Sequence, residues 1–511
     1  MKKVLKTLFS RVMLLSAILL TQLAIFILFI WQLSSYFVYF YAFFTMISIG
    51  VVIWMASQRT NPSHKLAWTI PILLFPVFGG LLYLFFRISS SANRFRKRIT
   101  SYQKDTFQYL SQDQEVLKAI QNENLSVANQ SLYIRNASSF PVCVNSTTEY
   151  FPSGEAFFKR LTEVLEQARH FIFIEMFIIE EGLMWNTILA ILERKVSQGV
   201  DVRVMFDDAG CMFTLPYKYK EKLIKKGIQC EVFNPFTPLL EIRMNHRDHR
   251  KNIIVDGHTG FTGGINLADE YINLYPKHGH WKDTGILVRG DAVWNMTVMF
   301  FQLWGYMCKD PNQCENFSPH SHAPQSFQSD GFVQPYADSP LDNESVGEFI
   351  YLNMINRAKK YVYIFTPYLV IDNEMTTSLI LAAKSGVDVR IVTPHIADKW
   401  YVFLVTQSFY NILLEAGVRI YEYTPGFLHA KVFVCDDEQA TVGTVNLDYR
   451  SFYMHFENGV WLYKSQTIRE IKKDFFETLE KCQEITLENI KKAGLPKRFL
   501  RGLLRLIAPM M

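Results

Sequence analysis

The sequence predicts an α/β protein of two pseudo-symmetric lobes, preceded by a helical transmembrane region at the N-terminus. Three observations lead to this prediction. Long apolar runs fill roughly the first ninety residues, short β-branched runs alternate with amphipathic stretches beyond them, and one order of motifs occurs twice. The chain has 511 residues, which is enough for a membrane anchor and two lobes of ordinary domain size.

Two apolar runs predict a pair of transmembrane helices. The run from Val12 to Trp31 carries no charge and is long enough as a helix to cross a hydrocarbon core of about 30 Å. A second run, Tyr36 to Ala56, follows after a few uncharged residues, whereas a signal peptide would show a shorter apolar region and a cleavage site. We therefore expect a membrane hairpin over about 12–31 and 36–56.

A third apolar run, Leu66 to Phe86, has an ambiguous topology, spanning or re-entrant, because Pro71, Pro76 and the Gly79-Gly80 pair interrupt it. Basic residues flank the whole region on both sides: Lys2, Lys3, Lys6 and Arg11 before it, and Arg87, Arg94, Arg96, Lys97 and Arg98 after it. Three full spans cannot place both groups on the cytoplasmic side. We expect a multi-pass protein of the cell membrane (anchor 1–100) with its catalytic lobes on the cytoplasmic face.

The chain beyond the anchor has the composition of an α/β protein, after a polar connector over 101–134 that we expect to be helical. Runs typical of strands begin at Phe171, Val200 and Lys251, and helices are expected over Glu155–Ala168 and Met184–Ser197. Seven scattered cysteines form no CxxC pair, which argues against a disulfide framework and a zinc site. The net charge of +5 fits a protein beside anionic lipid or a phosphorylated substrate without requiring either.

An internal repeat divides the catalytic region. Gly199-Val-Asp-Val-Arg-Val returns as Gly386-Val-Asp-Val-Arg-Ile, and His249-Arg-Lys251 returns as His429-Ala-Lys431 at nearly the same spacing. Such a pattern predicts two copies of one lobe, over 135–320 and 331–480, joined by a Pro- and Ser-rich segment. A duplication that preserved only structure is the alternative.

The repeated motif is HxKxxxxD, followed after six residues by a glycine-containing segment that ends in asparagine. Its members are His249, Lys251, Asp256, Gly263, Gly264 and Asn266 in the first copy, and His429, Lys431, Asp436, Gly443, Thr444 and Asn446 in the second. Residues two apart on a strand point to the same face, so each histidine and its lysine project together. Nearby His246 has no counterpart in the second copy, and we interpret it as a supporting residue.

These residue types suit phosphodiester transfer. A lysine ammonium and an asparagine amide held in place beforehand stabilise the charge that builds on phosphate oxygens without a metal. Two histidines can divide the remaining work: one attacks phosphorus to form a phosphohistidine, and the other protonates the leaving oxygen and then deprotonates the acceptor. A lone histidine in a strand is more often structural, but two complete copies favour catalysis.

This duplicated motif closely resembles the HKD signature of the phospholipase D superfamily, over about residues 135–480. The resemblance implies two phospholipase D-like α-β-α lobes with one active site at their interface. It also implies an acidic residue downstream of each asparagine that orients a histidine, and Asp283 and Glu457 stand at these positions. We expect Asp256 and Asp436 to be catalytic together with the histidines and lysines of the motif, and a structural role, in which they tie the strand to its turn, is the alternative.

Within the superfamily the chain resembles the bacterial cardiolipin synthases. The resemblance rests on Asn61-Pro62, Lys65-Leu-Ala-Trp68, Pro76 to Tyr83, Asn245 to Lys251, Thr366-Pro367-Tyr368 and the ending from Arg501. The chain departs from the family in an additional apolar run before the usual two and in Leu369 to Asp372. The resemblance implies that two phosphatidylglycerols in an anionic membrane give cardiolipin and glycerol, with no cofactor, metal or nucleic acid. We assign His249 as nucleophile and His429 as acid/base, although the pseudo-symmetry leaves the reverse open.

Other interpretations share the same residues. A phospholipase D that hydrolyses lipid, or a phosphatidyltransferase with another alcohol acceptor, differs only in the acceptor; an HKD nuclease and an inactive lipid-binding scaffold are further alternatives. The tail over 485–511 interleaves basic and large apolar residues, which is typical of an interfacial helix. A basic terminal helix docked on the protein is the alternative for this tail.

Overall fold

The computed structural model describes residues 20, 21, 23, 24, 27, 28, 37–58, 61–87, 90–236, 242–317, 326–492 and 494–510. The described chain forms two compact units. One comprises the chain up to Phe95 with Phe236–Met244 and Met510, and the other comprises Arg96–Pro235 and Asn245–Pro509. The span predicted over 12–31 lies almost wholly outside the described residues.

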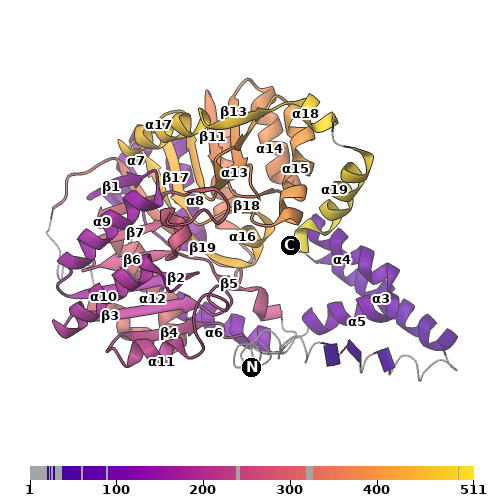
Figure 1. The fold of residues 1–511 in the computed structure, drawn as a ribbon, viewed down its shortest axis with the longest axis horizontal. Helices are drawn as coiled ribbons and strands as arrows, with labels where there is room; N and C mark the ends of the chain where they lie inside the picture. Colours follow the sequence, from indigo (N-terminus) through magenta and orange to yellow (C-terminus); the bar gives the residue numbers. More distant parts are fainter. Residues whose placement is uncertain are drawn as a thin grey trace. The chain divides into compact units, whose positions relative to one another are not determined.

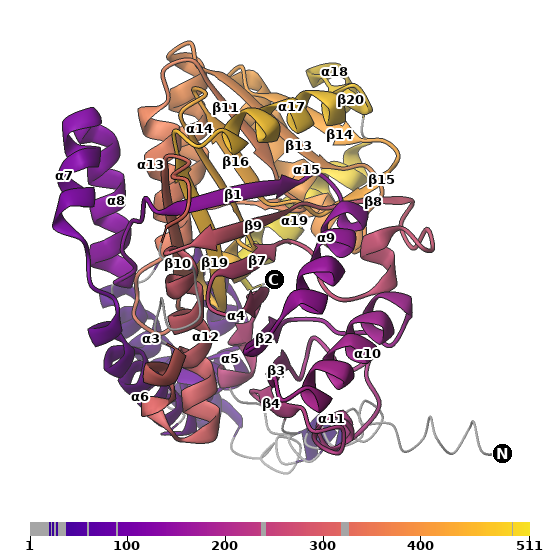
Figure 2. The ribbon, with the colours of Figure 1, turned by 90° about the vertical axis from the view of Figure 1, so that its left-hand side faces the viewer.

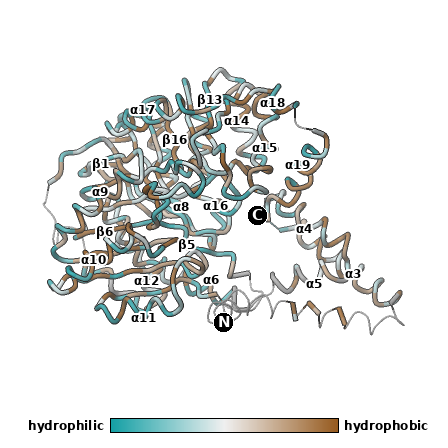
Figure 3. Tube along the Cα trace, viewed as in Figure 1, coloured by the Kyte–Doolittle hydropathy of each residue, from teal (hydrophilic) through white to brown (hydrophobic). Residues whose placement is uncertain are grey.

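The N-terminal unit contains α3 (Phe37–Ser57), α4 (Pro62–Leu74) and α5 (Pro76–Arg87). Among the described residues, Val38–Ser57 is one helix that is long and apolar enough to cross a membrane, and it corresponds to the span predicted over 36–56. Its hydrophobic character runs along its whole length (Figure 3). This finding indicates membrane association.

The third apolar run is not one helix. It breaks between α4 and α5 at Phe75, because a residue before proline is disfavoured in the helical conformation. Pro71 and the Gly79-Gly80 pair lie inside helices instead of interrupting them. The glycines permit close packing: a Cβ at Gly79 would lie 2.7 Å from Ile72 Cα in α4. We infer that the pair serves contacts between helices.

The connector is helical, as predicted, with α6 (Ser90–Thr106), α7 (Gln114–Glu123) and α8 (Leu125–Ser138). The apolar faces of α7 and α8 do not pack on the lobe that follows them. Ile120 and Ile134 are fully buried in the same core as Ile350 and Ile364 of the second lobe. The connector therefore crosses to the distant half of the chain.

The first lobe is a seven-stranded mixed sheet in the order β1-β9-β7-β6-β2-β3-β4. Its strands are β1 (Ser146–Phe151), β2 (Phe171–Met176), β3 (Asp201–Asp207), β4 (Gln229–Phe233), β6 (Asn252–Val255), β7 (Thr259–Gly263) and β9 (Gly285–Gly290). Helices α9 (Gly154–Gln167) and α10 (Leu183–Ser197) cover one face and α12 (Val293–Cys308) the other (Figure 1).

Alternation along β2 explains these layers. Ile172 and Ile174 join the core under α9 and α10, whereas Phe173 stacks on Phe300 of α12 with ring centroids 4.9 Å apart. Residues two apart in a strand point to the same face, and β2 is apolar on both faces because helices cover both. The strands and helices predicted for this lobe are confirmed.

The second lobe repeats this arrangement. Its sheet has the order β10-β19-β17-β16-β11-β13-β14-β20, whose first seven strands match those of the first lobe position by position. The strands are β10 (Phe332–Asp338), β11 (Tyr361–Phe365), β13 (Asp388–Pro394), β14 (Arg419–Tyr423), β16 (Val432–Cys435), β17 (Gln439–Gly443), β19 (His455–Tyr463) and β20 (Cys482–Ile485). Helices α13 (Val346–Arg357), α14 (Asn373–Lys384) and α15 (Trp400–Glu415) lie against one face and α17 (Thr467–Leu479) against the other. Figure 2 shows the two sheets together, and the predicted α-β-α pair is confirmed.

Short strands connect the two lobes. Strand β5 (Arg247–Asp248) pairs with β19 of the second lobe, and β8 (His280–Lys282) pairs with β15 (Gly426–Leu428). Each of these pairs involves the residues immediately before one of the two motif histidines. The junction between the lobes therefore determines where His249 and His429 lie.

Candidate active site

Backbone hydrogen bonds across the junction hold both motif histidines. The N–H of His249 donates to Phe456 O at 2.9 Å, and the N–H of His429 donates to Lys282 O at 2.7 Å. Each acceptor precedes the acidic residue predicted to orient a histidine. The two half-sites therefore have the same backbone contact, but the acceptor follows the histidine in the chain for His249 and precedes it for His429.

Each acidic residue pairs with the motif histidine of the other lobe. His249 Nδ1 lies 2.9 Å from each carboxylate oxygen of Glu457, and His429 Nδ1 lies 2.7 Å from Asp283 Oδ2. Both carboxylates are fully buried. A carboxylate accepts only, so each Nδ1 carries the proton and each Nε2 keeps the lone pair needed for attack or for accepting a proton.

The residues after each strand turn hold the two carboxylates. A Cβ at Gly264 would lie 2.1 Å from Asp283 Oδ1, so glycine leaves room for that carboxylate. At the matching position Thr444 donates its hydroxyl to Glu457 and accepts from Asn458 N at 3.0 Å. Gly263 and Gly443 pack as tightly, because a Cβ at either would lie within 2.6 Å of strand backbone. These four residues position the acids.

The two lysines are buried beside the histidines. Lys251 Nζ donates to His249 O at 2.8 Å, and Lys431 Nζ lies 2.8 Å from His429 Nδ1. Burial lowers the pKa of Lys251 to about 8 and that of Lys431 to about 7, although Glu457 and Asp283 oppose the shift. The site holds two ammonium groups that lose their protons far more readily than an exposed lysine does.

The pKa values of both imidazoles are lowered. Burial, followed by Lys251, Lys431 and His429, places the pKa of His249 well below its usual value. Burial and Lys431 lower the pKa of His429 to about 4, against the opposing effect of Asp283. The pKa of Asp283 is lowered because His429 and Lys431 outweigh the effect of burial. The two half-sites thus act electrostatically on each other, as one site requires.

The motif asparagines differ in their bonding. Asn266 accepts from Ile178 N at 3.0 Å and donates to the hydroxyl of Tyr271 at 2.6 Å, so both ends of its amide are used. Asn446 is held through its backbone by Ser451, while its buried Oδ1 has no hydrogen-bond partner among the described residues. The unused capacity of the Asn446 amide is therefore that of an acceptor, and its side chain also hydrogen-bonds Asp448.

Asp256 and Asp436 lie at the opposite end of their strands from the histidines. At about 3.3 Å per residue, the stretch from Lys251 to Asp256 covers roughly 16 Å. The carboxylate of Asp256 accepts from the backbone N–H groups of residues 169–171 at 2.7–2.9 Å, and that of Asp436 accepts from residues 359–361 at 2.7–3.0 Å. The structure favours the structural alternative for both and places them away from the reacting groups.

One site residue was missed by sequence reasoning. The His455 ring lies 5.5 Å from that of His249, with Nδ1 3.8 Å from Glu457 Oε1, whereas the matching position in the other half is Trp281, 5.6 Å from His429. The sequence feature that could have identified His455 is its position two residues before Glu457. This pair makes the two half-sites chemically different.

His246, interpreted as a supporting residue, makes a contact with the second lobe. Its Nδ1 lies 3.1 Å from Met454 O, which ties the segment before the motif to the second lobe. A second tie is Lys282, which donates to both carboxylate oxygens of Asp474 at 2.7 and 2.8 Å. Both contacts stabilise the junction instead of reaching the reacting groups.

Ligand atoms of His249, His455 and Glu457 all lie within 4.8 Å of one another, so these three side chains could hold a metal ion. Lys251 and Lys431, which oppose a proton on His249, would oppose a divalent cation in the same way. The cysteines are free thiols.

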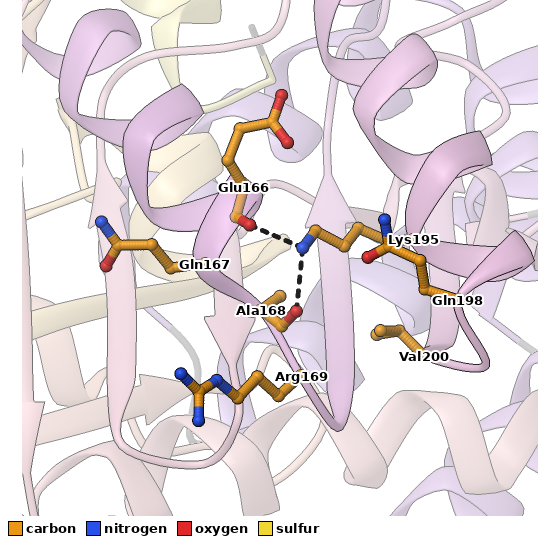
Figure 4. A pocket seen from close by; sticks show the side chains of 7 residues that line it. All are labelled: Glu166, Gln167, Ala168, Arg169, Lys195, Gln198 and Val200. Atoms are coloured by element: carbon orange, nitrogen blue, oxygen red, sulfur yellow. Dashed lines mark hydrogen bonds between the residues drawn. The ribbon is translucent and has the colours of Figure 1, made fainter.

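A pocket in the first lobe lies away from the histidines (Figure 4). Lys195 crosses it and donates to Glu166 O at 2.5 Å and Ala168 O at 3.0 Å, at the C-terminal end of α9. A cation there satisfies helix carbonyl groups that have no partner within the helix. The pocket therefore has a structural explanation.

Comparisons with known proteins agree with this site. A family profile described as "Cardiolipin synthase, PLD-like domain" matches residues 161–276 and 351–479, and one described as "Phospholipase D-nuclease N-terminal" matches 38–87. A cardiolipin synthase of Halalkalibacterium halodurans is 32% identical over 471 residues, which is 91% of this chain and 92% of the relative. The chain belongs to the cardiolipin synthase family of the phospholipase D superfamily.

Two further proteins are similar to this chain. An uncharacterized protein of Streptococcus mutans is 41% identical over 466 residues, covering 91% of this chain and all of the relative. The crystal structure of phosphatidylserine synthase from Haemophilus influenzae superimposes with a TM-score of 0.57 at 14% identity, covering 75% of this chain and all of that one. At that identity the likeness shows the fold alone.

Proposed function

We propose that this chain is a phosphatidyltransferase that joins two phosphatidylglycerol molecules into cardiolipin and releases glycerol. The observation that carries the proposal is the exchange of carboxylates: Glu457 orients His249 and Asp283 orients His429, each across the junction between the lobes. Two imidazoles prepared in the same way, with one lysine each, fit the two steps of a phosphodiester exchange. Family membership supplies the lipid substrate class.

In the first step Nε2 of His249 attacks the phosphorus of one phosphatidylglycerol. The P–N bond forms as the bond from phosphorus to the glycerol oxygen breaks, and His429 gives a proton to that oxygen. In the second step His429 takes the proton from the terminal hydroxyl of another phosphatidylglycerol, whose oxygen attacks phosphorus and releases His249. One diester replaces another, so the reaction needs no energy-rich cofactor.

The electrostatics of the site fit this order of steps. A nucleophile must be neutral, and the pKa of His249 lies well below its usual value. The acid must carry a proton, whereas burial and Lys431 lower the pKa of His429 to about 4. A phosphodiester anion between the lysines raises the pKa of nearby cationic groups, so substrate binding itself favours the protonated acid. Lys251 and Lys431 then hold the charged oxygens.

A trapping experiment tests the reaction and the assignment of the two histidines. The substrate is a phosphatidyl ester of nitrophenol, labelled with ³²P, whose leaving group needs no proton. His429→Ala should form a labelled adduct on residue 249 and resolve it slowly, whereas His249→Ala should form none. His395→Ala is the matched control, since His395 pairs with Glu422 at 2.9 Å in the same manner outside the site. An adduct on residue 429 would reverse the assignment.

Product analysis separates the rival acceptors. With labelled phosphatidylglycerol in nanodiscs, the full-length protein should give cardiolipin and glycerol in equal amounts. Phosphatidic acid without cardiolipin would establish a hydrolytic phospholipase D, and degradation of DNA that requires His249 would establish a nuclease.

We also propose that the N-terminal region spans the membrane more than once and leaves the lobes on the cytoplasmic face. The helix Val38–Ser57 and the exposed basic residues Arg94, Lys97 and Arg98 of α6 support this topology. A cysteine placed at Lys97 should react with an impermeant reagent only in inverted vesicles. Labelling of right-side-out vesicles would contradict the orientation.

A further inference from the structure

The C-terminal helix α19 (Leu495–Ile507) is attached to the second lobe through its arginines. Arg501 is only 7% exposed and donates to Gln407 of α15. The guanidinium of Arg505 lies 4.2 Å from the ring centroid of Phe409 on the same helix. Ala508, one turn beyond Leu504, belongs to the lobe's buried core. The polar side of α19 therefore faces the protein.

The apolar side of α19 faces outward. Leu495 and Phe499 are 78% and 76% exposed, and Leu503, Leu506 and Ile507 are also exposed. At 3.6 residues per turn these five residues share one face, opposite Arg501, Leu504 and Ala508. A helix on a globular protein in water ordinarily turns its apolar stripe to the core. In α19 the apolar stripe instead faces away from the protein.

Neighbouring residues indicate what covers this face. Arg498 is exposed beside the apolar stripe on the first turns of α19, and Lys497 is exposed on the opposite side of the helix. Helix α15, which holds α19, exposes Trp400 and Tyr401 at its own start, and such amphipathic rings favour the interface between lipid and water. Apolar residues beside basic ones match a leaflet that contains anionic lipid.

We propose that the outward face of α19 is a membrane-docking surface, which inserts into the interfacial region of an anionic leaflet. The helix is held to the lobe by Arg501 and Arg505 and to lipid by its leucines and Phe499. The N-terminal unit anchors the chain, and α19 provides a second attachment on the catalytic unit. This inference does not depend on the acceptor lipid or on which histidine attacks.

Depth measurement in nanodiscs tests this proposal on the full-length protein. Single cysteines replace Phe499, Leu503 and, as the matched control on the other side of the same helix, Lys497, in a background where the part-exposed Cys143, Cys308 and Cys482 are serine. Each cysteine carries a nitroxide, and its collisions with lipid-soluble oxygen and a water-soluble nickel chelate are compared. Discs contain one protein copy with phosphatidylglycerol or with phosphatidylcholine alone.

Labels at 499 and 503 should favour oxygen over nickel several-fold in phosphatidylglycerol discs, and the label at 497 should favour nickel. Equal nickel access at all three positions would overturn the proposal. A second chain, instead of lipid, would cover the face if two results were found together. The label at 499 would show strong spin–spin broadening in discs that hold two copies, and it would be as accessible to nickel as the label at 497 in discs that hold one copy. That outcome would also overturn the proposal. The result is independent of catalysis, so it remains readable if the proposed reaction is wrong.

A second measurement uses Phe499→Glu with Leu503→Glu, and the matched control is Lys497→Glu. The double variant should lose kcat/KM at least several-fold on vesicle substrate while keeping its rate on short-chain lipid dispersed in detergent. Wild-type rates of the double variant on both substrates would contradict the proposal. Equal loss on both substrates would also contradict it, since it would mean that α19 serves the fold of the lobe.

Discussion

His249 Nδ1 lies 2.9 Å from Glu457, a residue 208 positions further along the chain and in the other lobe. His429 and Asp283 form the reciprocal pair, 2.7 Å apart. Neither lobe alone can therefore orient its own histidine. Catalysis by this arrangement depends on the junction as much as on the motif itself.

Removing the charge of either acid should lower kcat with little change in stability. Glu457→Gln or Asp283→Asn presents an amide that can favour the wrong tautomer of its histidine, and such a change costs about 10⁴-fold in a comparable carboxylate–histidine pair. Steady-state kinetics of purified variants measure it. Glu422→Gln, in the pair with His395 outside the site, should keep its activity. A loss below tenfold at both site positions would contradict the orienting role.

Activity should depend on pH through Lys431 and His249. As pH rises through about 7, Lys431 in the free enzyme loses the proton that holds phosphate, so kcat/KM should fall above that value. As pH falls, protonation of His249 removes the lone pair that attacks phosphorus, and because the pKa of His249 lies well below its usual value this loss should appear only at acid pH. Lys431→Arg should move the alkaline limb upward, toward the value of about 8 for Lys251, because arginine stays charged. An alkaline limb that stays in place would assign it to another group.

Asp256→Ala and Asp436→Ala should lower stability and leave the chemistry of the folded enzyme largely intact. Each carboxylate accepts from three backbone N–H groups, of which that of Phe171 is buried and those of Lys359 and Lys360 are exposed. The loss should therefore be larger for Asp256, since a buried donor left unpaired costs about 1–3 kcal/mol. Both residues also have positive φ, 51° and 56°, which asparagine tolerates. Asp256→Asn should therefore recover part of the lost thermal stability. A tenfold fall of kcat at unchanged thermal stability would instead support a catalytic role.

Gly264→Ala should impair catalysis through Asp283. The new methyl group would lie 2.1 Å from Asp283 Oδ1 and must displace the carboxylate that orients His429. We expect kcat to fall at least about tenfold, consistent with misplacing a catalytic group by about 1 Å. Thr444→Ser, which keeps the hydroxyl bonded to Glu457, is the mild counterpart in the other half. Full activity of Gly264→Ala would mean that the carboxylate can shift without consequence.

Lys282→Met should destabilise the junction strongly. It leaves Asp474 buried without its cation, and breaking a buried ion pair on one side costs about 3–5 kcal/mol. The double variant Lys282→Met with Asp474→Leu should recover much of the loss. Thermal unfolding of the three proteins measures both effects. Equal unfolding temperatures for wild type and the single variant would show that the pair contributes nothing.

The duplicated motif, the α-β-α lobes and the helical connector were predictable from sequence, because they depend on local regularities. Alternating residues in β2, the spacing of His249 and Lys251, and the return of both in the second half are properties of short segments. The break at Pro76 and the helical Pro71 show the limit of such reasoning. A new helix begins at Pro76, whereas packing decided that the residues around Pro71 remain helical.

The sequence by itself predicted which residues carry the chemistry and how many lobes present them. Only the tertiary structure decided that each carboxylate serves the histidine of the opposite lobe, that α7 and α8 pack on the second lobe, that His455 lies beside His249, and that α19 turns its arginines inward. The physical reason is range. Residue type and periodicity act over a few positions, whereas these contacts depend on which surfaces meet after residues hundreds of positions apart have packed together.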